Sequence, residues 1–140
     1  METIISAKPP DVLADNFIVA TNEDWVREWQ IKNSGVIVPI QPDWKLYMQL
    51  QRTSTGDLGV TCSTDNGRLV VVDQGAGKFG LRLKQADAAQ ISPAGYQYDI
   101  VLVAGDGIYR LVTGTITVDQ GITNIPGQEK WIHYPLILRP

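Results

Sequence analysis

The sequence predicts an all-β fold: an immunoglobulin-like antiparallel β-sandwich of about seven to nine short strands. Apolar and polar residues alternate with a period of two in several segments, as in strands that bury one face. Turn residues recur at intervals of about 8 to 12 residues, a spacing typical of sandwiches and barrels. No segment long enough for a stable helix separates these strands, which argues against α/β architectures. We expect the sandwich over residues 16–119, an extended N-terminal arm over residues 1–15 and a C-terminal arm over residues 120–140.

The clearest predicted strand runs from Trp44 to Arg52. Alternation is strict over its whole length, which indicates a half-buried antiparallel strand with one face on the core. The expected inner face carries Trp44, Leu46, Met48 and Leu50, and the expected outer face carries Lys45, Tyr47, Gln49 and Gln51.

Two further segments with β-prone patterns precede this strand. Residues 17–20 form a short first strand, and residues 24–31 follow with alternating large apolar side chains. The residues on one side of that ladder are Trp25, Trp29 and Ile31. The two tryptophans are also four residues apart, which is helical spacing, so one or two turns of helix are the alternative. A strand is preferred because Gly35 and Pro39 stop any long helix.

The Asn66-Gly67 dipeptide predicts a β-hairpin between strands at residues 58–64 and 68–72, because both residue types tolerate positive φ. Strand and turn patterns alternate from there to residue 118. The expected elements there are a glycine turn at 75–77, a strand at 78–84, a short helical connector at 85–90, a strand at 96–104, a turn at 105–107 and a strand at 108–118.

Composition narrows the classes of partner. The 140-residue chain has a formal net charge of −3 and no cluster of Lys and Arg, so nucleic acid is not an expected partner. Apolar runs are far shorter than the roughly 20 residues of a membrane-spanning helix, so no membrane partner is expected. The N-terminus lacks the cationic start and apolar core of a secretion signal, which predicts a cytosolic protein. The single cysteine, Cys62, lies in a predicted strand and is expected to be buried rather than reactive.

No catalytic residue, cofactor or resident metal ion is expected. Residues 75–80 match G-x-G-x-x-G, but a strand follows where the dinucleotide fingerprint requires a helix. The only histidine, His133, has no evident catalytic or metal-binding partner. Most aspartates lie in glycine-rich turns, where carboxylates bond to nearby backbone; a loose calcium site among them is an alternative. Asp99 lies within a strand and is expected to pair with Arg110 across the hairpin.

The C-terminal arm is strongly apolar and aromatic. Its segment either adds an edge strand to its own sandwich or docks on another subunit, where an extended segment pairs with an exposed sheet edge. Docking on another subunit is preferred. The candidate protein-interface residues are Trp131, His133, Tyr134, Leu136 and Leu138.

Between Trp44 and Asp119, a little over half of the chain, strand and turn motifs follow one another in a recognisable order. The motifs are Thr64–Leu69, Gly80–Leu83, Ala86–Ala89, Pro93–Ile100 and Arg110–Val118. This order resembles that of small immunoglobulin-like virion structural proteins of tailed bacteriophages, similar to upper-baseplate and tail-fibre-associated modules. The segment 95–98 also resembles a tyrosine corner, with Tyr96 and Tyr98 as the structural tyrosines.

The resemblance implies a non-enzymatic phage virion structural protein, assembled in the host cytoplasm and located in the virion. Its expected role is that of an adaptor or connector in the tail, baseplate or neck, which docks neighbouring subunits or fibres. Its expected partners are other virion proteins, and the chain itself is expected to form a symmetric homo-oligomeric ring or assembly. The alternatives are a capsid decoration (cement) protein, and a carbohydrate- or receptor-binding module that uses Trp25, Trp44 or Tyr47 as stacking platforms.

Overall fold

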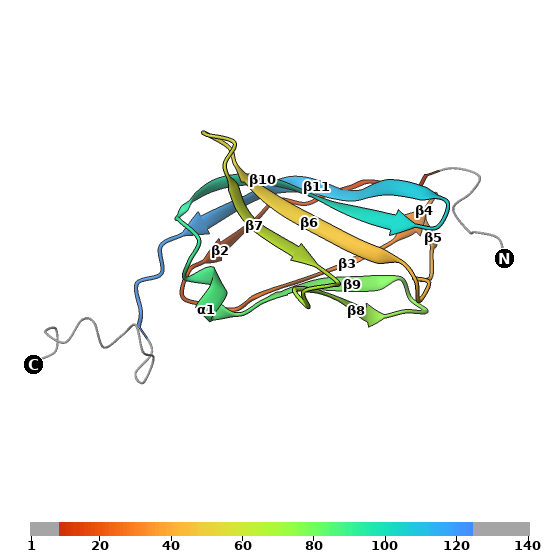
Figure 1. Cartoon of the computed structure of the whole chain (residues 1–140), viewed down its shortest axis with the longest axis horizontal. Coiled ribbons are helices and arrows are strands. Elements are labelled where there is room, and N and C mark those ends of the chain that lie inside the picture. Colours follow the sequence, from red (N-terminus) through yellow and green to blue (C-terminus); the bar gives the residue numbers. More distant parts are fainter. Residues whose placement is uncertain (1–8, 125–140) are drawn as a thin grey trace, which may run out of the picture.

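Two β-sheets lie face to face and enclose one hydrophobic core (Figure 1). The computed structural model describes residues 9–124. The larger sheet has the strand order β1-β11-β10-β6-β7, with β2 also paired to β11, and the smaller sheet has the order β3-β9-β8. The elements are β1 (Leu13–Ala14), β2 (Phe17–Ala20), β3 (Trp25–Gln30), β4 (Lys32–Asn33), β5 (Val36–Ile37), β6 (Lys45–Arg52), β7 (Leu58–Ser63), β8 (Leu69–Asp73), β9 (Lys78–Leu83), α1 (Gln85–Ala88), β10 (Ala94–Ala104) and β11 (Gly107–Asp119).

The predicted all-β sandwich is confirmed by this architecture. The orders β3-β9-β8 and β11-β10-β6 match the strand orders of the two sheets of an immunoglobulin domain, while the finer immunoglobulin-like assignment stays a prediction. The short connector at α1 and the hairpins β8–β9 and β10–β11 also form as expected.

The inner faces of the two sheets follow the alternation in the sequence. In β6 and β10, every second side chain is buried, as the period of two requires. The smaller sheet adds Trp25 and Trp29 from β3, so that segment is a strand and not the alternative helix. The largest fully buried side chains are Trp25, Phe79, Leu46, Met48, Leu50, Leu69, Leu81, Leu83, Ile100, Leu102 and Ile116.

The hairpin predicted at Asn66-Gly67 is wrong, because β7 and β8 do not pair with each other. β7 pairs with β6 in the larger sheet and β8 pairs with β9 in the smaller sheet, so the turn carries the chain from one layer to the other. Gly67 has a φ of 78°, but among the described residues the only non-glycine with positive φ is Ser34. Asn66 instead uses its side-chain oxygen, which accepts hydrogen bonds from the backbone amides of Ser63 and Arg68.

A two-residue hairpin of this kind occurs elsewhere, at Ser34-Gly35 between β4 and β5. Both residues have positive φ, 53° and 81°, as a type I′ turn requires. The Asp11 carboxylate accepts hydrogen bonds from both of their backbone amides, at 3.0 and 3.1 Å. Asp11 therefore fixes a turn that the local sequence signals only weakly.

Residues 9–15, the described part of the expected N-terminal arm, are built into the sandwich. β1 runs parallel to β11, with Leu13 opposite Val112 and Ala14 opposite Thr113, and β2 continues the same edge. Pro10 is buried, and the Asp11 amide donates to the carbonyl of Lys32. The folded part thus begins before the boundary expected at residue 16.

Candidate functional site

The interface residues expected in the C-terminal arm lie outside the described residues: Trp131, His133, Tyr134, Leu136 and Leu138. The two expected tyrosines lie on β10, with both rings buried. The Tyr96 hydroxyl donates to the carbonyl of Ser92 at 2.7 Å, four residues upstream, as the tyrosine at a sandwich corner does. The Tyr98 hydroxyl donates instead to the carbonyl of Asp15, which lies between β1 and β2.

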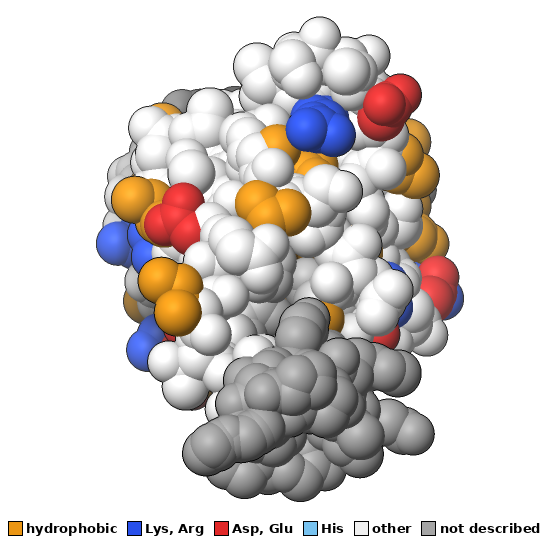
Figure 2. All heavy atoms as spheres, turned by 90° about the vertical axis from the view of Figure 1, so that its left-hand side faces the viewer, with side chains coloured by type: hydrophobic (Ala, Val, Ile, Leu, Met, Phe, Trp, Pro, Cys, Tyr) orange, Lys and Arg blue, Asp and Glu red, His pale blue; other side chains and the backbone are white. Residues whose placement is uncertain are grey.

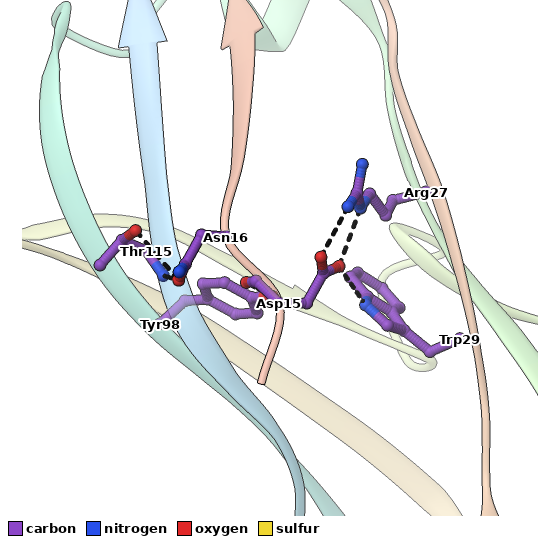
Figure 3. Close-up of polar contacts among 6 residues, drawn as sticks. All are labelled: Asp15, Asn16, Arg27, Trp29, Tyr98 and Thr115. Carbon is purple, nitrogen blue, oxygen red and sulfur yellow. Dashed lines mark hydrogen bonds and ion pairs between the residues drawn. The ribbon is translucent and has the colours of Figure 1, made fainter. Parts of the chain in front are cut away.

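Asp15 joins the N-terminal segment to both sheets (Figure 3). Its carboxylate receives two hydrogen bonds from the Arg27 guanidinium, at 2.6 and 2.8 Å, and one from Trp29 Nε1 at 2.8 Å. Its carbonyl accepts from Tyr98 of the larger sheet, whereas Arg27 and Trp29 belong to the smaller sheet. Arg27 also lies 4.4 Å above the ring of Phe17, which adds a cation–π contact. We refer to these five residues as the Asp15 clip.

The charges in the Asp15 clip stabilise each other. The hydrogen bonds from Arg27 and Trp29 hold the pKa of the Asp15 carboxyl below its usual value, against the opposing effect of burial. The same ion pair raises the pKa of Arg27. Burial and the neighbouring Asp15 raise the pKa of the Tyr98 hydroxyl, so it stays a protonated donor. Each polar side chain of the Asp15 clip has a hydrogen-bond partner within the clip. Its role is to hold the N-terminal segment on the two sheets.

A second set of hydrogen bonds holds the described chain just after β11. The amide of Gly121 donates to the Thr21 hydroxyl at 2.9 Å, and the Asn22 side chain donates to the carbonyl of Thr123 at 3.0 Å. A Cβ at Gly121 would collide with the Asn22 side chain, so the close approach requires glycine. The described chain enters the fold beside β4 and β5 and leaves it after β11, at opposite ends of the long axis (Figure 1). The Asp15 clip lies between these ends, beside Thr113 in the middle of β11.

The outer face of the larger sheet carries a polar hollow of about 540 Å³ across β6, β10 and β11. Its side chains are almost all uncharged amides and hydroxyls, with one carboxylate and one guanidinium. The residues that point outward around it are Gln49, Gln51, Gln97, Asp99, Arg110, Thr113 and Thr115. We call this set the amide face.

Two β-bulges flank the amide face. Leu111 has no partner on β10, because Ile100 pairs with Val112 and Val101 pairs with Arg110. On the other side, Gly59 of β7 is left over between the pairs that its neighbours form with β6. Bulged strands bend and twist more strongly than regular ones, and bulges are frequent beside functional sites because they redirect side chains.

The ion pair expected between Asp99 and Arg110 does not form. The bulge shifts the register, so Asp99 lies opposite Thr113 and Arg110 lies opposite Val101. Within residues 9–124, the side chains of Asp99, Arg110 and Gln49 have no hydrogen-bond or salt-bridge partner. Among the amides, Gln97 donates to Gln51 at a long 3.3 Å. The amide face therefore presents unused donors and acceptors.

The described part of the chain offers neither a metal-binding cluster nor an exposed thiol. No group of three or more His, Cys, Asp or Glu side chains that could hold a metal ion occurs between residues 9 and 124. Cys62 is buried, and burial raises the pKa of its thiol to about 11. None of the described helices has the length and apolar character to cross a membrane.

Charged side chains are sparse on the end of the molecule where the described chain leaves β11. Figure 2 shows this end: the few acidic and basic side chains lie near one another toward the top and the margins, and uncharged side chains and backbone cover most of the surface that is not grey. Large exposed apolar side chains occur at several strands, including Ile18 of β2, Val26 of β3 and Ile108 of β11. Surfaces of this kind suit contacts with proteins or neutral ligands better than contacts with polyanions.

Comparison with known proteins supports the all-β fold and assigns no family. No family model matches the sequence, and no curated protein matches it. Among solved structures, the chain is similar to a family 123 glycoside hydrolase from Clostridium perfringens, described in a study of glycolipid glycan hydrolysis, with 11% identity and a TM-score of 0.52. That alignment covers 81% of this chain and 24% of the hydrolase, so the chain spans about a quarter of the hydrolase's length. A second similar structure is CopC from Methylosinus trichosporium OB3b, with 12% identity, a TM-score of 0.44 and coverage of 86% and 93%.

Proposed function

We propose that this chain is a non-enzymatic structural adaptor, a virion protein that connects neighbouring subunits or fibres in a phage tail, baseplate or neck. The observation that supports the proposal is that the described chain is held at both ends of the sandwich. Asp11 bonds the incoming chain to the β4–β5 turn, and the Thr21–Gly121 contact holds the outgoing chain after β11, at the opposite end (Figure 1). A rigid body with its chain ends held far apart suits a connector between two neighbours.

Open sheet edges supply places where such neighbours could pair. β8 is an edge strand of the smaller sheet, and its Val71 and Val72 are exposed by 42% and 41%. An edge of this kind accepts an extended segment through backbone hydrogen bonds, with specificity from alternate side chains. The apolar C-terminal residues expected to form an interface, Trp131 and Leu136 among them, provide a segment of suitable composition.

The structure bears differently on the two alternative functions, capsid decoration and carbohydrate or receptor binding. A capsid decoration protein would use the same fold and chain ends, and it differs in location and copy number. A carbohydrate- or receptor-binding module that stacks its ligand on Trp25 or Trp44 is wrong in that detail, because both indoles are buried in the core. Tyr47 is half-buried on the outer face of β6 and remains a candidate residue for stacking against a ligand.

The adaptor function is tested by removing the C-terminal arm. We expect the full chain to form a discrete oligomer in analytical ultracentrifugation at micromolar concentration. We expect the chain that ends at Asn124 to be monomeric and to remain folded. A full chain that stays monomeric, or a shortened chain that assembles equally well, would contradict the role of the arm.

The location in a virion is tested by quantitative mass spectrometry of purified phage particles that encode this chain. A low copy number relative to the major capsid protein supports a tail, baseplate or neck ring, and a high one supports capsid decoration. Absence from the particle overturns both structural roles.

A further inference from the structure

The geometry points to a binding site on the amide face, and we propose that it takes a neutral, hydroxyl-rich saccharide. This inference goes beyond the adaptor function and does not depend on it. It concerns residues of β6, β10 and β11, whose outward side chains lie outside the core. The Thr115 hydroxyl also donates to the Asn16 side chain at 3.1 Å, beside the Asp15 clip (Figure 3).

The first step is the supply of hydrogen-bonding groups. Amide side chains both donate and accept, a carboxylate accepts from two hydroxyls, and a guanidinium donates through a planar fork. Asp99, Arg110 and Gln49 make no side-chain hydrogen bond or ion pair within residues 9–124, so these groups are available to a ligand. Sugar hydroxyls, which act as donors and acceptors together, match such a mixed set.

The second step is the arrangement in rows across the strands. Gln51, Gln97 and Thr115 lie opposite one another on β6, β10 and β11. The next row consists of Gln49, Asp99 and Thr113. Strands lie about 4.8 Å apart, and successive outward residues of one strand lie about 7 Å apart. The result is a two-dimensional grid of polar groups, to which a ligand with hydroxyls around a ring can bond at several points.

The third step is an apolar contact at the end of the grid. Tyr47, Val101 and Arg110 form the row after Asp99. The Tyr47 hydroxyl donates to Asp65 at 3.1 Å, and Lys45 bonds to the same carboxylate, so the ring is held in place from its far end. A fixed aromatic ring beside an aliphatic side chain can pack against the C–H face of a pyranose, because tyrosine combines an apolar body with a polar tip.

The charge and the backbone select among ligand classes. One carboxylate and one guanidinium, Asp99 and Arg110, leave the amide face without net charge, which favours a neutral ligand over a sulfated or sialylated one. β6 and β10 are interior strands with backbone groups paired on both sides, so an extended peptide finds no edge to join there. A ligand on this face must therefore bond to side chains, which sugar hydroxyls can do.

The test begins with the full chain on a printed glycan array that carries neutral, sulfated and sialylated oligosaccharides. We expect binding to neutral oligosaccharides, with no gain from sulfate or sialic acid. Absence of binding to every neutral glycan overturns the proposal, as does a preference for anionic glycans.

Variants then assign the binding to the amide face by isothermal titration with the best neutral glycan from the array. Asp99→Ala and Gln49→Ala should each weaken binding by about tenfold or more, the loss of roughly one hydrogen bond. Neither side chain makes a hydrogen bond within the described residues, so both variants should melt at the wild-type temperature. The matched control is Glu28→Ala, an exposed strand carboxylate of the smaller sheet. Unchanged affinity in both amide-face variants, or an equal loss in Glu28→Ala, overturns the assignment.

Discussion

At the scale of single residues, Asp15 connects the N-terminal segment to both sheets. Its side chain connects Arg27 and Trp29 while its backbone connects Tyr98, so one residue bridges both layers of the sandwich. Trp29 is only 5% exposed, and its Nε1 loses its hydrogen-bond acceptor if the carboxylate is removed. An unsatisfied buried donor costs about 1–3 kcal/mol, and hydrogen bonds to charged groups contribute about 1.5–3 kcal/mol.

We therefore expect Asp15→Ala to lower the free energy of unfolding by about 2–3 kcal/mol, measured by urea denaturation at pH 7. The matched control is Asp119→Ala at the exposed end of β11, which should change the free energy of unfolding by less than about 0.5 kcal/mol. Equal effects of the two substitutions would show that the Asp15 clip contributes little.

The same carboxylate should make stability depend on pH in the acidic range. The folded-state pKa of Asp15 lies below its value of 3.8 in the unfolded chain, so its stabilising effect is complete above that value. The effect is lost as the pH falls through the folded-state pKa, where the folded form must also take up the proton. The difference in unfolding free energy between wild type and Asp15→Asn should thus be constant from pH 7 to about 5 and shrink below about pH 4. A difference that stays constant down to pH 2.5 would contradict this assignment.

Cys62 offers a residue-scale test of core packing. The thiol is 1% exposed and burial raises its pKa to about 11, so almost no thiolate exists at neutral pH. We expect no reaction of the native protein with Ellman's reagent at pH 8 within an hour, and reaction of one thiol per chain in 6 M guanidinium chloride. Fast modification without denaturant would mean that β7 opens readily from β6.

At the scale of elements, the sequence predicts strands well wherever one face is buried. The alternation from Trp44 to Arg52 yields the inner and outer faces of β6 correctly, because burial itself imposes the period of two. Local signals fail at Asn66-Gly67, since a turn dipeptide specifies a reversal but not the partner of the strand that follows. β8 pairs with β9, which is reached later in the chain, and Asn66 serves as a side-chain cap instead.

Glycines in left-handed turns provide an element-scale prediction with an internal control. Gly67 and Gly77 both have positive φ, but a Cβ at Gly67 meets nothing within 4 Å, whereas one at Gly77 would collide with the carbonyl oxygen of Val38. Gly67→Ala should lower the free energy of unfolding by about 1–2 kcal/mol, the cost of a left-handed L-residue. Gly77→Ala should cost at least about 1 kcal/mol more, because the β8–β9 turn must also move away from Val38. Equal losses in urea denaturation would mean that this contact relaxes freely.

At the scale of the whole molecule, the parts that the sequence left undetermined are those that depend on distant segments. Gln49 and Gln51 were expected on an outer face, but the adjacency of their strand to Gln97 and Asp99 follows from the sheet order and not from any local pattern. In the Asp15 clip, Asp15 and Tyr98 are in contact although they lie 83 positions apart in the sequence. No propensity or motif predicts such a contact. The expected arm at residues 1–15 had only its prolines as a local signal, so its pairing with β11 could not be foreseen.

The N-terminal edge of the fold is therefore the most informative place to shorten the chain. A chain that starts at Pro9 keeps the Asp11 bonds to the β4–β5 turn, β1 and the Asp15 clip. We therefore expect it to melt at the temperature of the full chain. Starting at Phe17 removes all three and leaves Trp29 Nε1 and the Tyr98 hydroxyl without their partners. A loss of about 3 kcal/mol, at roughly 4 °C per kcal/mol in a domain of this size, should lower the melting temperature by at least about 10 °C in calorimetry. If both shortened chains melt together, residues 9–16 lie on the sandwich without stabilising it, and the incoming chain is not held as a connector requires.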